Sequence, residues 1–301
     1  MLKFNEINIR DPFILPYGDK YYMYGSRVGT PNPKIKWNWG EQTGFDVYIS
    51  SDLENWSEPK SVFEKQEGFW GEYHFWAPEV HFYKGRFYML ATFKADNKCR
   101  ATHILVSDTP DGVFAPLSEK PATPEGWECL DGTLYVDKKG KPHIVFCHEW
   151  LQIDNGTVCE TALADDLSSP ISQPRLLWSG ADHPSVYEAC KDSGHYVTDG
   201  PYLYRCDNGD LLSIWSSFAE KGYAELIAKS DNGDIDGNWS VLAEPLWAEN
   251  GGHGMLFKDF EGNLNFVMHS PNDATKERPV IKKIIDKDGC LSFQGENYEN
   301  Y

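Results

Sequence analysis

Five ionisable residues stand at similar places in five repeated segments of the 301-residue sequence. They are separated by 68, 52, 68 and 54 residues, and they are Asp11, Glu79, Asp131, Asp199 and His253. Such spacing excludes contact within one helix or strand, but rotation about a common axis would bring the five together. Glycoside hydrolysis requires one carboxylic acid that protonates the leaving oxygen and one carboxylate that activates water or attacks the sugar. A ring of acids at one channel mouth could do that chemistry.

Three of these residues, Asp11, Asp131 and Asp199, are the principal candidates. A single Asp before Pro or Gly commonly starts a turn, so each alone would have a structural interpretation. Their shared position in a repeat favours a functional one. Crowded carboxylates raise one another's pKa values, so one acid can stay protonated while another is ionised. The third carboxylate therefore has a plausible tuning role.

The repeat itself predicts the elements that must hold these residues. Each unit contains two strands rich in aromatic and β-branched residues, joined by a turn with Gly, Asp or Asn, which is typical of a hairpin. A third strand and a polar turn follow in most units. Four strands per unit, five times over, predict an all-β, five-bladed β-propeller that forms one domain over residues 1–301. The hairpins are expected at residues 12–26, 78–93, 132–150, 200–218 and 254–272.

Composition limits the partners that the chain can have. With 46 acidic and 28 basic residues the formal net charge is −18, which would repel nucleic acid and anionic membranes. The sequence has no apolar run long enough to span a bilayer. Its first residues lack the features of a signal peptide, which predicts a cytoplasmic protein, or a periplasmic or secreted one if the sequence was trimmed. The oligomeric state is left open.

Several motifs, taken in order, resemble glycoside hydrolase family 43 over about residues 8–272. They are RDPFI (10–14), WAPEV (76–80), LDGTLYVDKKGKPHIVF (130–146), VTDGPYLYR (197–205) and GGHGMLF (251–257). The resemblance implies a five-bladed propeller, net inversion at the anomeric carbon, and oligo- or polysaccharide substrates of plant type that contain arabinose or xylose.

The resemblance also implies a role for each carboxylate. Asp11 would be the general base that activates water, Asp131 would orient the acid and raise its pKa, and Asp199 would be the general acid. The family usually has Glu where this chain has Asp199, and Asp has a shorter reach. We therefore consider three alternatives: Asp199 serves directly, another acid such as Glu188 or Glu149 protonates the leaving group, or activity is weak or absent. We favour the first, because the surrounding motif keeps its register.

The remaining site predictions concern a metal and the sugar. In the family a histidine in a motif like that of His253 helps hold an ion or water, so calcium or sodium could bind there, although no cofactor is expected to be required. Trp76 and Trp39 are expected to stack on sugar rings. Glu149 and Gln152 are expected to hydrogen-bond to sugar hydroxyls, and His74 and Ser217 are expected to bind substrate as well.

These features predict an inverting glycosidase, with an α-L-arabinofuranosidase as the first choice and a β-xylosidase as the second. A glycoside phosphorylase is an alternative, but it would need a basic cluster for phosphate, and the pocket motifs contain none. A non-catalytic carbohydrate-binding propeller is the other alternative. The Asp at position 199 favours it, whereas the presence of Asp11 and Asp131 argues against it.

Overall fold

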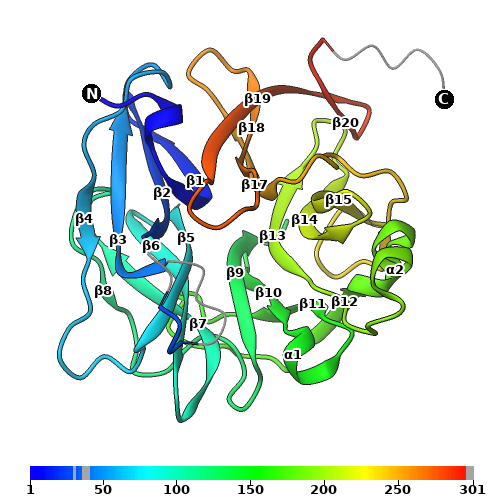
Figure 1. Ribbon diagram of the computed structural model, residues 1–301, viewed down its shortest axis with the longest axis horizontal. Helices are drawn as coiled ribbons and strands as arrows, with labels where there is room; N and C mark the ends of the chain where they lie inside the picture. The colour runs from blue at the N-terminus through cyan, green and yellow to red at the C-terminus, as the bar shows by residue number, and fades with distance from the viewer. Residues whose placement is uncertain (30–31, 36–40, 296–301) are drawn as a thin grey trace.

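The computed structural model describes residues 1–29, 32–35 and 41–295, and it confirms the predicted architecture. Five sheets, each of four antiparallel strands, are arranged in a ring around a central axis (Figure 1). Each sheet is built from one contiguous piece of the chain, with its strands in sequence order from the axis outward. The chain is therefore a five-bladed β-propeller in which no strand is exchanged between blades.

The strands of each blade follow the predicted repeat. Blade 1 contains β1 (Ile9–Tyr17), β2 (Lys20–Val28), β3 (Glu41–Ser50) and β4 (Lys60–Phe63). Blade 2 contains β5 (Tyr73–Tyr83), β6 (Arg86–Ala95), β7 (Lys98–Ser107) and β8 (Ala115–Pro116). Blade 3 contains β9 (Cys129–Val136), β10 (Pro142–His148), β11 (Thr157–Ala162) and β12 (Arg175–Ser179). Blade 4 contains β13 (Asp199–Arg205), β14 (Leu211–Ala219), β15 (Gly222–Ser230) and β16 (Trp239–Val241). Blade 5 contains β17 (Gly252–Lys258), β18 (Leu264–Ser270), β19 (Arg278–Lys287) and β20 (Cys290–Phe293).

Helices in the described residues are short and lie between strands. Two are α-helical, α1 (Trp150–Ile153) and α2 (Pro184–Cys190), and two are 3-10 turns, η1 (Phe4–Glu6) and η2 (Gly180–Asp182). None is long and apolar enough to cross a membrane.

Aromatic side chains fill the space between blades 1 and 2. Phe75 and Phe93 of blade 2 meet edge to face at 4.9 Å between ring centroids. Both rings pack against Phe45 of blade 1, at 6.0 and 5.9 Å. All three side chains are buried, so this contact joins two blades by apolar burial.

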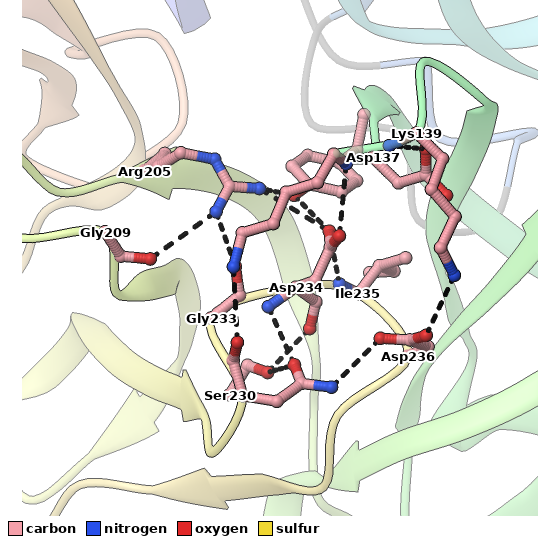
Figure 2. A network of polar contacts seen from close by, with 12 residues as sticks. Asp137, Lys139, Arg205, Gly209, Ser230, Gly233, Asp234, Ile235 and Asp236 are labelled. Atoms are coloured by element: carbon pink, nitrogen blue, oxygen red, sulfur yellow. Dashed lines mark hydrogen bonds and ion pairs between the residues drawn. The ribbon is translucent and has the colours of Figure 1, made fainter.

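Polar contacts join the blades as well. Between blades 3 and 4, Asp234 accepts hydrogen bonds from the Tyr135 hydroxyl at 2.7 Å and from the Lys138 amide at 3.1 Å. Nearby, Lys139 of blade 3 pairs with Asp236 of blade 4 at 3.8 Å (Figure 2). Where the ring closes, the Asn8 side-chain amide donates to the carbonyls of Thr275 and Glu277, both at 2.9 Å. The N-terminal segment is thus fastened to blade 5, which holds the inner strands at fixed positions around the axis.

Candidate active site

Each inner strand carries a β-bulge at the same place. In every blade, two consecutive residues of the inner strand lie opposite a single residue of the second strand, and the ladder of paired residues resumes after them. The first bulged residue has a positive φ in all five blades, between 44° and 54°. These equivalent residues are Asp11, Ala77, Asp131, Gly200 and His253. Four of the five are not glycine, so the surrounding structure must hold a backbone conformation that L-residues disfavour.

This register corrects the expected equivalence of the five ionisable residues. Asp11, Asp131 and His253 do occupy the same position, but Gly200 rather than Asp199 is their counterpart in blade 4. Asp199 lies one residue earlier. Glu79 lies two residues beyond Ala77, where it pairs with His81 Nε2 at 3.0 Å. Because every blade has the same bulge, the bulge does not explain the difference. The predicted hairpins begin at Pro12 and Gly200, whereas the ladders make Pro12, Pro78 and Pro201 equivalent.

Two adjoining cavities open at this ring. The inner cavity, of about 90 Å³, is lined by Arg10, Asp11, Trp76, Leu130, Asp131, Asp199, Tyr223 and His253. The outer cavity, of about 460 Å³, shares Asp199 and Trp76 with it but does not reach Asp11, Asp131 or His253. Asp199 therefore lies at the boundary between the cavities, and the other two carboxylates face only the inner one.

Asp11 is held in its ionised form. The Ser26 hydroxyl donates to Asp11 Oδ2 at 2.7 Å, and His253 Nδ1 lies 3.2 Å from Oδ1. Burial acts to raise the pKa of Asp11, but the charges of His253 and Arg10 and the hydrogen bond from Ser26 contribute to lowering the pKa to about 2. A carboxylate with these neighbours is ionised at neutral pH, which is the state that a general base needs.

Asp131 and Asp199 have the opposite electrostatics. Burial and the charge of Asp11 act to raise the pKa of Asp131, whereas the hydrogen bond from the Gly200 amide acts to lower it and so favours the ionised form. Burial and the charge of Asp131 raise the pKa of Asp199 to about 7. The Gly200 amide donates to Asp131 Oδ2 at 3.1 Å, and the Tyr223 hydroxyl donates to Asp199 Oδ2 at 3.0 Å. The site thus combines an ionised carboxylate with a carboxylic acid that keeps its proton near neutral pH.

We expect Tyr223→Phe to move the alkaline limb of the kcat/KM profile toward higher pH by roughly one unit. The Tyr223 hydrogen bond lowers the pKa of Asp199, so its loss raises that pKa and the acid stays protonated to higher pH. Rates measured from pH 4 to 10 check this result. Tyr187→Phe, on the exposed face of α2, is the matched control and should leave the limb in place. A limb that moved downward would contradict the assignment.

Trp76 forms one wall of both cavities. The His74 ring stacks on its indole at 4.2 Å, and the Arg100 guanidinium lies 4.3 Å from the ring centroid. His74 Nδ1 and Arg100 Nη2 are 3.0 Å apart, so both groups must lie on the same face of the indole. Glu149 pairs with Arg100, and both side chains are buried. Trp76 also lines both cavities, and its stacking on a sugar ring stays a prediction.

Other predicted site residues lie elsewhere. Gln152 uses its amide within blade 3, bonding the Glu128 amide at 2.9 Å, His148 at 2.7 Å and the Gly126 carbonyl at 2.9 Å. Ser217 is buried and donates to the Val197 carbonyl at 2.6 Å.

The two acids that could have replaced Asp199 differ in position. Glu149 lines the outer cavity, where it is paired with Arg100. Glu188 is exposed on α2 and pairs with Lys191 at 2.5 Å. Trp39 lies outside the described residues.

His253 lies beneath the bulge of blade 4. A Cβ on Gly200 would lie 2.7 Å from His253 Cδ2, so glycine is needed there for close approach as well as for its φ of 48°. Nδ1 of His253 faces the carboxylates, 3.2 Å from Asp11 and 3.8 Å from Asp131. Within the described part of the chain, no group of three or more His, Cys, Asp or Glu residues is arranged to hold a metal ion.

The sequence interpretation missed three residues at the site. Arg10 precedes Asp11 and bonds Glu277 at 2.9 Å, and its place before the bulge, equivalent to that of Asp199, could have identified it. Tyr223 comes from β15 and Arg100 from β7, both third strands. Third strands lie away from the axis, so only their long side chains extend to the cavities. The sequence repeat does not show which of these side chains do so.

The fold and the carboxylate pocket define a class, the five-bladed propellers with a catalytic-type acid pair at the channel mouth. The chain belongs to the glycosyl hydrolases family 43, whose pattern matches residues 5–289, and this family places it among the glycosidases. A solved structure, the endo-arabinase from Bacteroides thetaiotaomicron VPI-5482, is 39% identical, with a TM-score of 0.83. The alignment covers 96% of this chain and 98% of that one.

Two curated relatives are more distant. The extracellular endo-alpha-(1->5)-L-arabinanase 1 of Bacillus subtilis (strain 168) is 24% identical over 48% of this chain and 45% of its own length. The extracellular exo-alpha-(1->5)-L-arabinofuranosidase ArbA of Cellvibrio japonicus (strain Ueda107) is 23% identical over 72% of this chain and 61% of its own length. The chain thus spans about half the length of the curated relatives that it matches.

Proposed function

We propose that the chain is an inverting glycoside hydrolase that cleaves α-L-arabinofuranosyl linkages, with xylosyl linkages as the second choice. The observation that carries the proposal is the separation of pKa values at one channel mouth, about 2 for Asp11 and about 7 for Asp199. Two carboxyl groups in opposite protonation states are what acid and base catalysis on one glycosidic bond requires.

In this mechanism the sugar to be released occupies the inner cavity and the leaving group occupies the outer one. The carboxylate of Asp11 accepts a proton from a water molecule, whose oxygen attacks the anomeric carbon as the glycosidic bond breaks. Asp199, at the boundary between the cavities, donates its proton to the departing oxygen. Asp131 keeps the pKa of Asp199 high through its charge. Attack opposite the leaving group inverts the anomeric centre.

The arabinosyl specificity rests on the relatives rather than on the cavity alone. The 39% identical structure is an endo-arabinase, and both curated relatives act on α-1,5-linked L-arabinose by name. The outer cavity of about 460 Å³ extends past the acids to Trp150, Leu151 and Phe218, so it has room for a leaving group of sugar size. Both points favour an arabinan-derived oligosaccharide.

The test is to incubate the purified chain with α-1,5-arabino-oligosaccharides and with xylo-oligosaccharides, and to follow the products by proton NMR. We expect arabinose or shorter arabino-oligosaccharides to appear first with the inverted anomeric configuration. Faster release of xylose than of arabinose would favour xylosyl linkages over arabinofuranosyl linkages as the substrate. Initial products with retained configuration would contradict inversion.

Water is a better acceptor here than phosphate. Arg10 and Arg100 line the outer cavity, and each is paired with a buried glutamate, Glu277 and Glu149. Their charges are already balanced, which argues against a phosphorylase. Binding without catalysis is disfavoured as well, because a passive site would have no need of an acid whose pKa is raised to about 7.

We propose further that hydrolysis needs no cofactor and that an ion near His253 would be structural. Dialysis against EDTA should then leave kcat unchanged. If an ion is bound at the channel centre, its removal should lower the thermal unfolding temperature. A scan of unfolding with and without added calcium separates the two effects. Loss of kcat that calcium alone restores would overturn the cofactor-free mechanism.

Both curated relatives are extracellular enzymes by name, which favours the secreted alternative over the cytoplasmic one for this chain.

A further inference from the structure

A hydrogen-bond ring connects neighbouring blades around the active site. One residue of each second strand faces the residue just before the bulge in its own blade, and these five are Ser26, Thr92, Cys147, Ser216 and His269. In four blades this side chain accepts a hydrogen bond from the amide of the bulged residue of the next blade. The distances are 2.8 Å for Ala77 to Ser26, 2.9 Å for Asp131 to Thr92, 2.7 Å for His253 to Ser216 and 3.2 Å for Asp11 to His269.

The ring is interrupted at blade 3, where the equivalent side chain is Cys147. A thiol is a weak acceptor compared with a hydroxyl or an imidazole. The corresponding donor, the Gly200 amide, instead bonds Asp131 Oδ2 at 3.1 Å. The interruption thus falls between the blades that carry Asp131 and Asp199.

Cys147 lies where a stronger acceptor would compete for that amide. Its side chain is fully buried, and its thiol interacts with the carboxylates of Asp131 and Asp199 and with the Thr198 hydroxyl. In the other blades a hydroxyl or, in blade 5, the His269 imidazole accepts the hydrogen bond from the amide of the neighbouring bulge. The thiol leaves it available to a carboxylate.

We infer that Cys147 is a positioning residue. Its thiol does not accept the hydrogen bond that the equivalent side chains accept, so the Gly200 amide remains hydrogen-bonded to Asp131. The amide orients Asp131 and favours its ionised form, and ionised Asp131 in turn keeps Asp199 protonated. The inference rests on the proposed function, because it assigns Cys147 to the tuning of the proposed acid.

The test compares Cys147→Ser with Cys147→Ala. The introduced hydroxyl should accept from the Gly200 amide and remove it from Asp131, so we expect kcat on arabino-oligosaccharides to fall about tenfold. Ionised Asp131 becomes less favourable, so the pKa of Asp199 falls and the alkaline limb of kcat/KM moves to lower pH. Alanine has no acceptor, so Cys147→Ala should lose less activity than Cys147→Ser even though it removes more buried volume.

Cys159→Ser, a buried cysteine on β11 of the same blade, is the matched control and should keep the wild-type pH profile. Thermal unfolding verifies that each variant is folded. A Cys147→Ala variant at least as impaired as Cys147→Ser would overturn the inference, because a packing role predicts that order.

A crystal structure of Cys147→Ser tests the hydrogen bond without any assay. We expect Gly200 N within hydrogen-bond distance of the introduced hydroxyl and farther from Asp131 Oδ2 than 3.1 Å. An amide that stays on Asp131 contradicts the inference. An inactive wild-type chain contradicts the proposed function, whereas an active wild type matched by Cys147→Ser contradicts this inference alone.

Discussion

Asp11→Asn is expected to lower kcat on arabino-oligosaccharides by about 10²–10⁴-fold, the usual contribution of a general base. Asparagine fills the same space and can still accept from the Ser26 hydroxyl, which now lies 2.7 Å from Asp11 Oδ2. It cannot take a proton from water. Because the pKa of Asp11 is lowered to about 2, the wild-type base is ionised at every pH well above that value, and the acid limb of the profile should lie at low pH.

Initial rates at saturating substrate measure this effect, and calorimetric titration shows whether the variant still binds sugar. The matched control is Asp19→Asn in the turn of the same hairpin, whose exposed carboxylate lies far from the channel mouth. It should retain wild-type kcat. If Asp11→Asn turned over substrate as fast as the wild type, Asp11 could not be the base, and the ionised carboxylate would have to be sought elsewhere.

The repeat predicts the blades well because hairpins are local. A polar turn between two aromatic strands determines their pairing, so the five hairpins appear where the sequence places them, as with Tyr17 opposite Lys20 around Gly18. Resemblance to a family then identifies the carboxylates of Asp11, Asp131 and Asp199, which the structure brings to the same cavity.

What the hairpin pattern misses is the register of blade 4. Beginning that hairpin at Gly200 makes Asp199 the counterpart of Asp11, whereas the ladder gives that position to Gly200, whose amide donates to Asp131. Contacts such as Tyr223 with Asp199 join strands whose order in space is known only once the sheet is formed. Tyr223 on β15 reaches Asp199 on β13 past the strand between them, and such a contact depends on packing distances that the sequence repeat does not predict.

Asp199→Asn should separate substrates by their leaving groups. A sugar alkoxide is a poor leaving group, so the glycosidic oxygen must be protonated as the bond breaks. Without the acid, kcat/KM on arabino-oligosaccharides should fall by about 10²–10⁴-fold. Nitrophenolate leaves without a proton, so hydrolysis of p-nitrophenyl α-L-arabinofuranoside should fall far less. The alkaline limb set by the Asp199 pKa of about 7 should disappear from the profile of the variant.

Asp192→Asn, an exposed carboxylate seven residues earlier, serves as the control and should treat both substrates as the wild type does. Glu149→Gln tests the competing acid, since Glu149 also lines the outer cavity. If only Glu149→Gln discriminated between leaving groups, Glu149 would be the proton donor. Discrimination by Asp199→Asn instead means that an aspartate is long enough here, because its strand position before the bulge places the carboxyl at the boundary where the two cavities meet.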